Sequence, residues 1–164
     1  MGLMKKINKL RIAIISLIVL IFSISVFTVV TYSKKTAVRR DNISKIGMKI
    51  IVNKKEYNVK LENNETVLEI LKDLPLDKYF VNYEDAFYSG NLPMKVAVSG
   101  EEVNKLEKNH VYYHPGWGGI VIVYKDYEFT NEKLIHVGTI KGDIKLKGPM
   151  VKIKVDTNEK KANS

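Results

Sequence analysis

The sequence predicts a mainly β domain, a closed barrel or a sandwich of about eight short strands with one or two helical pieces, behind a single N-terminal transmembrane helix. Three observations lead to this prediction. A charge-free apolar segment occupies the beginning of the chain, short β-prone runs fill most of the remainder, and turns containing Gly, Pro or Asn separate those runs. Many short strands with such punctuation are typical of antiparallel barrels and sandwiches.

The apolar segment runs from Ile12 to Tyr32, 21 residues without a charged side chain. A helix of this length covers ~30 Å, which matches the hydrocarbon core of a bilayer. The apolar region of a cleaved signal peptide is usually shorter, and the small-residue pattern of a cleavage site does not follow this segment. We therefore expect an uncleaved anchor that binds the lipid bilayer through residues 12–32, with a cleaved signal peptide or a buried core helix as alternatives.

The basic residues lie on both sides of this segment, in a tail (residues 1–11) and a predicted stalk (residues 33–47). Residues 1–40 contain eight Lys and Arg and no acidic residue, which accounts for eight of the nine net positive charges. Four cations precede the segment and four follow it, so the positive-inside rule alone gives no orientation. A short tail with cations close to the apolar edge is typical of a signal anchor. We expect a single-pass protein of the bacterial plasma membrane whose C-terminal domain lies on the outer face.

Charge and cysteine content exclude several classes of function. Residues 41–164 contain 19 Lys against 18 Asp and Glu, so the domain is nearly neutral and we expect no nucleic acid partner. The chain contains no cysteine, which excludes disulfides, thiolate nucleophiles, zinc sites with Cys ligands and a lipoprotein anchor.

The globular domain is predicted to span residues 48–155, followed by a polar tail (156–164). It opens with a hairpin of Met48–Val52 and Tyr57–Leu61, in which apolar and polar residues alternate. Thr66 and Glu69 have the spacing of a capping box, and Pro75 is expected to end the helix that follows. Six further strands are predicted at 78–84, 95–98, 109–114, 119–124, 134–140 and 150–155, with turns between them that include Ser89-Gly90-Asn91.

The order of these features resembles the bacterial cyclophilin-like domain family. The resemblance covers most of residues 48–155, and it is carried by the opening hairpin, the helix from Glu65 to Leu71 with Leu74-Pro75, Leu92-Pro93, Asn109–Tyr113, Ile120–Tyr124 and Ile135–Ile140. It implies a cyclophilin-like closed antiparallel barrel of eight strands with capping helices. It implies no particular activity, because members of that family share the barrel without a uniform catalytic motif.

Cyclophilin-type prolyl isomerisation is not favoured by the sequence. True cyclophilins use an arginine to hold the substrate carbonyl, whereas the three arginines of this chain, Arg11, Arg39 and Arg40, all precede the domain. A lysine does not offer the planar five-donor fork of an arginine. We assign no catalytic residue, and the sequence favours a non-catalytic module over an enzyme.

The histidines do not predict a metal site. His110 and His114 are four residues apart, but Val111, Tyr112 and Tyr113 between them favour a strand. Four residues of a strand span ~13 Å, too far for two imidazoles to share one metal. A site that includes His136 would need supporting carboxylates from elsewhere in the fold, so we predict neither a metal nor a cofactor.

The densest cluster of functional side chains is Tyr112–Gly119, which contains the only tryptophan. Aromatic rings and imidazole offer flat amphipathic surfaces, and glycines let a ligand approach the backbone. Aromatic rings beside a glycine-rich turn often only close a barrel end, and we favour this interpretation of the cluster. The alternative is a binding site for a peptide or small ligand at a barrel mouth, with Tyr113, His114, Trp117, Tyr124 and Tyr88 as the candidate ligand-binding residues.

These observations favour a binding or interaction module for a peptide or small ligand. The first alternative is a peptidyl-prolyl isomerase-like or other peptide-processing enzyme with a non-standard site, in which His114 and nearby tyrosines would be the proton partners. The second is an accessory subunit of a larger assembly.

Overall fold

The computed structural model describes Ile18, Ile21, Ile43 and residues 46–158. The chain divides into two compact units, residues 1–41 and 42–164, and the fold described below belongs to the second. The predicted anchor at 12–32, apart from Ile18 and Ile21, lies outside the described residues, as do the basic tail and most of the predicted stalk. Among the residues described, no helix has the length and apolar character needed to cross a bilayer.

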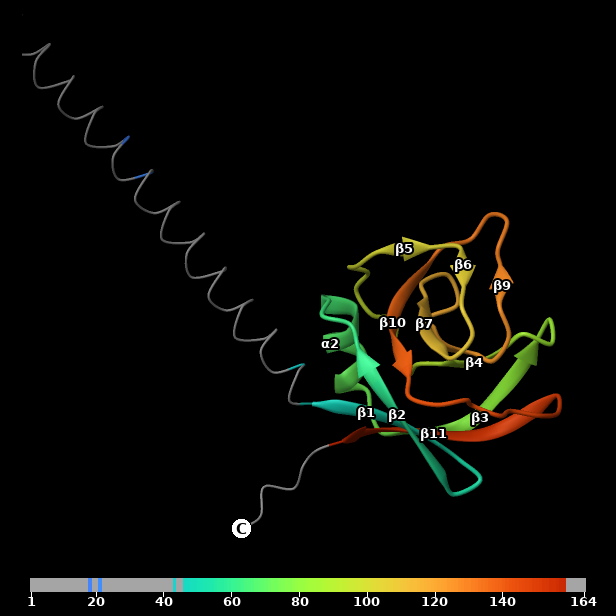
Figure 1. The fold of residues 1–164 in the computed structure, drawn as a ribbon. Coiled ribbons are helices and arrows are strands. Elements are labelled where there is room, and N and C mark those ends of the chain that lie inside the picture. The colour runs from blue at the N-terminus through green and yellow to red at the C-terminus, as the bar shows by residue number, and fades with distance from the viewer. Residues whose placement is uncertain (1–17, 19–20, 22–42, 44–45, 159–164) are drawn as a thin grey trace, which may run out of the picture. The chain divides into compact units, whose positions relative to one another are not determined.

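Eight antiparallel strands form a closed barrel (Figure 1). They hydrogen-bond in the order β2-β1-β11-β3-β4-β8-β7-β10, and β10 pairs back with β2 to close the ring. The predicted eight-stranded barrel is thereby confirmed. The elements are β1 (Gly47–Val52), β2 (Lys55–Leu61), α2 (Glu65–Lys72), β3 (Leu76–Tyr83), β4 (Phe87–Asn91), β5 (Glu102–Val103), β6 (Lys105–Leu106), β7 (His110–His114), β8 (Gly119–Val123), β9 (Tyr127–Glu128), β10 (Leu134–Ile140) and β11 (Met150–Asn158).

The barrel closes through a short seam of three residue pairs between β10 and β2, in which Gly138 lies opposite Leu61. A Cβ atom at Gly138 would lie 2.5 Å from the carbonyl oxygen of Lys60, well inside van der Waals contact. Only glycine lets the two strands approach this closely. The seam therefore depends on the absence of a side chain at position 138.

Alternate residues of the strands fill the barrel interior. The centre holds large side chains that are almost completely buried, among them Met48, Phe80, Tyr88 and Tyr113. Helix α2 lies beside β2 and β10 in Figure 1, and its Val67 and Ile70 are fully buried in the same core. Burial of this apolar face agrees with the packing expected from the spacing of its apolar residues.

A second core covers part of the outer wall. Every residue of β8 is buried, so this strand is covered on both faces. On the outer side, Phe87, Val121 and Leu134 pack with Leu106 of β6 and Tyr127 of β9. Strands β6 and β9 form a separate two-stranded sheet, and β5 pairs with β10. The two segments that carry these short strands, one before β7 and one after β8, thus cover part of the outer face of β4, β8, β7 and β10.

The predicted capping box is wrong. Asn64 caps the helix, because its side-chain oxygen accepts a hydrogen bond from the Val67 amide at 2.9 Å. Thr66 lies inside the helix and is fully buried, and Glu69 pairs with Lys72 instead of reaching back. The Thr66 hydroxyl accepts a hydrogen bond from the amide of Ser99 at 2.7 Å, so it is used for tertiary structure.

One predicted strand and one predicted turn are also wrong. Residues 95–98 are not a strand, whereas Ser89-Gly90-Asn91 belongs to β4. A Cβ atom at Gly90 would lie 2.8 Å from the Phe80 ring, so this glycine permits close packing and does not mark a turn. The 95–98 segment is held instead by the Val96 amide, which donates to the Tyr113 hydroxyl, and by the Ala97 carbonyl, which contacts Thr66.

Candidate functional site

The five residues predicted to bind a ligand lie in three different places. Tyr113 and Tyr88 lie in the barrel core, and Tyr88 also lines a pocket together with Tyr124. His114 and Trp117 stack together on the outer wall. The fold therefore does not gather them into one site.

Tyr113 has a structural position. Its side chain is fully buried in the barrel, and its hydroxyl accepts a hydrogen bond from the Val96 amide at 3.1 Å. Both the ring and the hydroxyl are thus occupied by the chain itself, which leaves no part of Tyr113 exposed to a ligand.

His114 is fixed in one orientation beneath Trp117. The two rings stack with centroids 3.9 Å apart and an angle of 5° between their planes. The Trp117 amide donates to Nδ1 of His114 at 3.2 Å, so the proton of the neutral ring lies on Nε2. That Nε2 donates to the Glu132 carboxylate at 2.5 Å. Because His114 is only 3% exposed, it supports the Trp117 ring and is shielded from a ligand by it.

Trp117 belongs to an aromatic cluster on the outside of the barrel. Its ring centroid lies 5.5 Å from that of Tyr83, 6.0 Å from Phe129 and 6.3 Å from Phe87. Phe87 belongs to the second core, so the cluster continues the apolar covering of the outer wall. Trp117 remains 36% exposed and Tyr83 41% exposed, and these two rings form the solvent-facing edge of the cluster.

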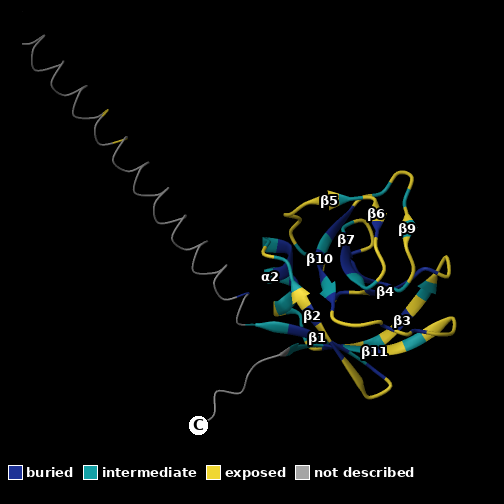
Figure 2. Cartoon of the chain, in the orientation of Figure 1, coloured by how far each residue is buried: buried dark blue, intermediate teal, exposed yellow. Residues whose placement is uncertain are grey.

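From Tyr83 the exposed apolar surface continues along β3. Strand β3 alternates, with every second residue facing outward, and Tyr79 and Val81 are 60% and 39% exposed. Met150 of β11 lies directly opposite Val81 and is also exposed. In Figure 2 the stretch where β3 and β11 run side by side carries exposed residues. We call Tyr79, Val81, Tyr83, Met150 and Trp117 the apolar strip.

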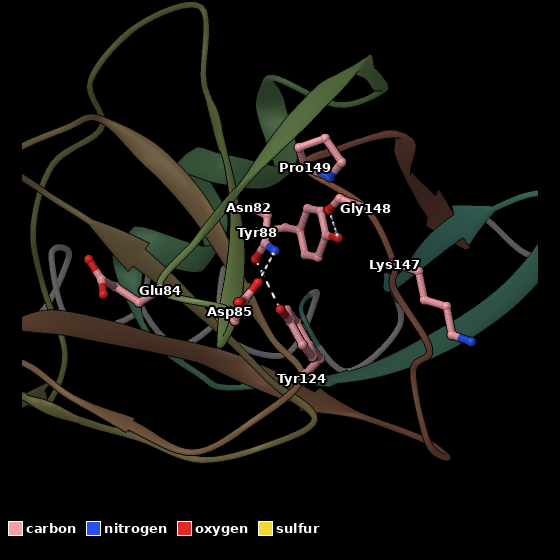
Figure 3. Close-up of a pocket in the computed structure, with 8 residues that line it drawn as sticks. All are labelled: Asn82, Glu84, Asp85, Tyr88, Tyr124, Lys147, Gly148 and Pro149. Atoms are coloured by element: carbon pink, nitrogen blue, oxygen red, sulfur yellow. Dashed lines mark hydrogen bonds between the residues drawn. The ribbon is translucent and has the colours of Figure 1, made fainter.

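A separate pocket of about 740 Å³ opens between the β3–β4 turn and the segment before β11 (Figure 3). The residues that line it are Asn82, Glu84, Asp85, Tyr88, Tyr124, Lys147, Gly148 and Pro149. The volume is within the range of ligand pockets, about 300–1,000 Å³.

The polar groups inside this pocket bind one another. The Tyr88 hydroxyl donates to the Gly148 carbonyl at 2.5 Å, and the Tyr124 hydroxyl donates to Oδ1 of Asn82 at 3.0 Å. The side-chain amide group of Asn82 in turn donates to the Asp85 carboxylate at 2.9 Å. Burial, and then the neighbouring Tyr124 and Asp85, raise the pKa of Tyr88, so its hydroxyl stays protonated and keeps donating. With these groups occupied, the pocket offers a ligand few free hydrogen-bonding groups.

Two features of the outer wall were not predicted from the sequence. Glu132 lies 18 residues after His114, and nothing in its local sequence indicates the contact. The strip along β3 did leave a signal, because Tyr79, Phe80, Val81 and Tyr83 place apolar residues on both faces of one strand. A strand that is apolar on both faces either lies under a second layer or exposes an apolar surface.

Comparisons with known proteins agree with the barrel. The sequence model of the Cyclophilin-like family matches residues 50–158. A solved structure, the solution structure of the hypothetical protein AF2241 from Archaeoglobus fulgidus, is similar with a TM-score of 0.52 and 16% sequence identity. The similarity covers 68% of this chain and 94% of that protein, and at this identity it supports the fold alone. No protein of curated function matches the sequence.

Proposed function

This chain belongs to the cyclophilin-like family, and from that premise we propose that it is a membrane-anchored binding module whose domain lies outside the cytoplasm and recognises an extended peptide through the apolar strip. The family fixes the barrel and leaves the activity open. The proposal therefore rests on the surface of this particular domain.

The observation that carries the proposal is the continuous exposure of the apolar strip. Exposed apolar side chains are ordinary when scattered, but contiguous groups of them mark interaction sites. Tyr79, Val81 and Tyr83 repeat at every second residue of one strand and so cover ~13 Å. The alternate side chains of an extended peptide have the same repeat. A linear surface of this kind fits an extended chain better than a compact small molecule, which would be favoured by a concave site.

The end of the strip at Trp117 has the properties of an anchoring point. Tryptophan and tyrosine supply large rigid contact areas at low cost in side-chain entropy, and they are enriched among residues that dominate binding energies. Stacking on His114 and the bond from His114 to Glu132 hold the Trp117 ring in place before a ligand arrives. A surface that is already ordered loses less entropy on binding.

Membrane attachment is the part of the proposal that rests on sequence alone. Residues 12–32 contain no charge and have the length of a bilayer span. In this arrangement the stalk would hold the barrel near the outer face of a bacterial plasma membrane, where peptide segments of other exported proteins are available.

The experiment is selection of a displayed library of linear peptides against the purified full chain in mild detergent. Affinities of the selected peptides are then measured for the original chain and for Tyr79→Ser, Val81→Asp and Trp117→Ala. Loss of a central contact typically weakens binding at least about tenfold. Tyr79 and Val81 are exposed, so their variants should remain folded even where Trp117→Ala disturbs His114. Lys147→Ala, in the pocket, is the matched control.

The proposal is contradicted if no peptide is selected, or if the selected peptides bind Tyr79→Ser and Val81→Asp as tightly as the original chain. The alternative function, a peptidyl-prolyl isomerase-like enzyme with a non-standard site, is examined with the same peptides. Exchange between cis and trans X-Pro bonds, measured by NMR, would accelerate in the presence of the chain and slow again with Trp117→Ala. Acceleration that depends on Trp117 would replace the non-catalytic proposal by the enzymatic one.

A further inference from the structure

Two histidines face each other on the outside of the barrel, away from the apolar strip. His110 is the first residue of β7 and His136 lies on the adjacent strand β10, where the register shifts between His136 and Gly138. The ring centroids are 5.0 Å apart, with 51° between the ring planes. Shifts of this kind re-aim side chains and occur near functional sites. The fold thus brings together two imidazoles that are distant in the sequence.

In each ring Nδ1 faces a neighbouring oxygen, which leaves Nε2 as the candidate metal ligand. Nδ1 of His110 lies 3.1 Å from the Lys108 carbonyl oxygen, which can only accept, so the proton of the neutral ring is on Nδ1. Nδ1 of His136 faces the Glu62 carboxylate at 3.6 Å. Nε2 of His136 is buried and has no hydrogen-bond partner within the part of the chain that the structure describes.

A carboxylate lies next to this pair. One oxygen of Glu107 is 3.8 Å from Nε2 of His110, and the Glu107 side chain is 69% exposed. An unprotonated imidazole nitrogen and a carboxylate are both acceptors, so they repel each other unless a proton or a cation lies between them. Two ligands bound to one tetrahedral zinc at about 2.0–2.2 Å lie roughly 3.4 Å apart, close to the observed separation.

We propose that Nε2 of His110, Nε2 of His136 and the carboxylate of Glu107 bind one Zn²⁺ ion, with the fourth position open to water. Two imidazoles that bind the same tetrahedral zinc through Nε2 have ring centroids about 5 Å apart, as these do. Imidazole and carboxylate ligands suit zinc among the common divalent metals. Two imidazoles, one carboxylate and an open position also form a known type of zinc site.

The groups behind the two rings match the surroundings of natural zinc ligands. A histidine that binds zinc usually donates its other N–H group to a backbone carbonyl or a carboxylate. The Lys108 carbonyl would serve His110 in this way and Glu62 would serve His136.

Movement is needed to form the site, because Nε2 of His136 is buried and an ion must reach it. Among residues 46–158, no three His, Cys, Asp or Glu side chains are already placed around a common metal position. Glu107 is the exposed member, so a rotation of its side chain brings in the third ligand at little cost in packing. The bound ion would link β7 to β10 beside the seam where β10 meets β2.

The test is a zinc titration of the full chain, purified in mild detergent without a histidine tag and stripped of metal with a chelator. We expect one Zn²⁺ per chain by calorimetry, with the NMR signals of the His110 and His136 rings shifting together and those of His114 unchanged. His110→Ala, His136→Ala and Glu107→Gln should each weaken binding at least about tenfold. Glu132→Gln is the matched control, because it changes the carboxylate beside the third histidine and should leave zinc affinity unchanged.

The unfolding temperature of each variant is measured without and with zinc. The values without zinc separate loss of the site from loss of the fold. Zinc should raise it in the original chain and in Glu132→Gln, and not in His110→Ala or His136→Ala. Absence of saturable binding would overturn the proposal. So would binding that survives in His110→Ala or His136→Ala, or a zinc-dependent shift confined to the His114 ring.

Discussion

Replacing Gly138 by alanine tests whether the barrel depends on the close approach of β10 and β2. The new Cβ atom would lie 2.5 Å from the Lys60 carbonyl oxygen and 2.9 Å from a methyl group of Val59, whereas ordinary contact begins at 3.4 Å. The Lys60 oxygen belongs to the backbone, so no side-chain rotation relieves the contact. The two strands must separate at the seam.

The expected loss of stability follows from two contributions. Overpacking costs about 1–3 kcal/mol. Separation of the strands also weakens the hydrogen bonds at the two ends of the seam, from the Glu62 amide to the Val137 carbonyl at 2.8 Å and from the Lys141 amide to the Asn58 carbonyl at 2.7 Å. Each is worth about 1 kcal/mol, so Gly138→Ala should lower the free energy of unfolding by roughly 3–5 kcal/mol.

Equilibrium unfolding in urea, followed by the fluorescence of Trp117, measures this loss. With a slope of about 1.5 kcal/mol per molar urea, the midpoint should fall by roughly 2–3 M. Gly142→Ala is the control, because no atom lies within 4 Å of the added methyl group and the only cost is the positive φ of 96°. That cost is about 1–2 kcal/mol. A Gly138→Ala variant no less stable than Gly142→Ala would refute the steric explanation.

Three further perturbations test single contacts. Thr66→Val should lower the free energy of unfolding in urea by about 1–3 kcal/mol, because the Ser99 amide loses its acceptor. Thr66→Ser keeps the hydroxyl and should retain most of that stability. Equal losses in the two variants would contradict this. In the metal-free chain, burial lowers the folded-state pKa of His136, so the unfolded state takes up a proton first and the unfolding temperature should fall as pH drops below about 6.5. His136→Gln should flatten this dependence, and an unchanged slope would contradict it. Tyr88→Phe removes the hydrogen bond to the Gly148 carbonyl and should lower the free energy of unfolding by about 1 kcal/mol. Because the pKa of Tyr88 is raised, this variant should also lack one of the tyrosines that ionise at the highest pH in an absorbance titration.

The sequence predicts the barrel wherever local alternation reflects the burial of one face. The hairpin of β1 and β2 is an example, since most of the outward residues are polar and the pairing follows from the short turn. Strand β4 was missed because Gly90 and its polar neighbours have the composition of a turn, while the reason for the glycine is the Phe80 ring from another strand. The expected number of strands was still right, because the wrongly assigned strand at 95–98 replaced β4 in the count.

The candidate sites could be predicted only as far as residue type. Tyr88, Tyr113 and Trp117 were recognised as aromatic, but which side of the wall each ring faces depends on register, and a shift of one residue reverses it. The partners that define the sites are distant in the sequence. Glu132 beside His114, and His136 beside His110, become visible only when β7, β8 and β10 are in place.

Large side chains occupy the interior of the barrel, which supports the proposal of a binding site on its outer wall. Phe80, Tyr88 and Tyr113 fill the centre, and all three side chains are fully buried. On the outside, the face of β4, β8, β7 and β10 is covered by the second core, whereas Tyr79 and Val81 on β3 remain open. Trp117 lies where the covered and open regions meet. A peptide on the open region would therefore extend the second core across the bare strand, burying the apolar strip as β6 and β9 bury the neighbouring wall.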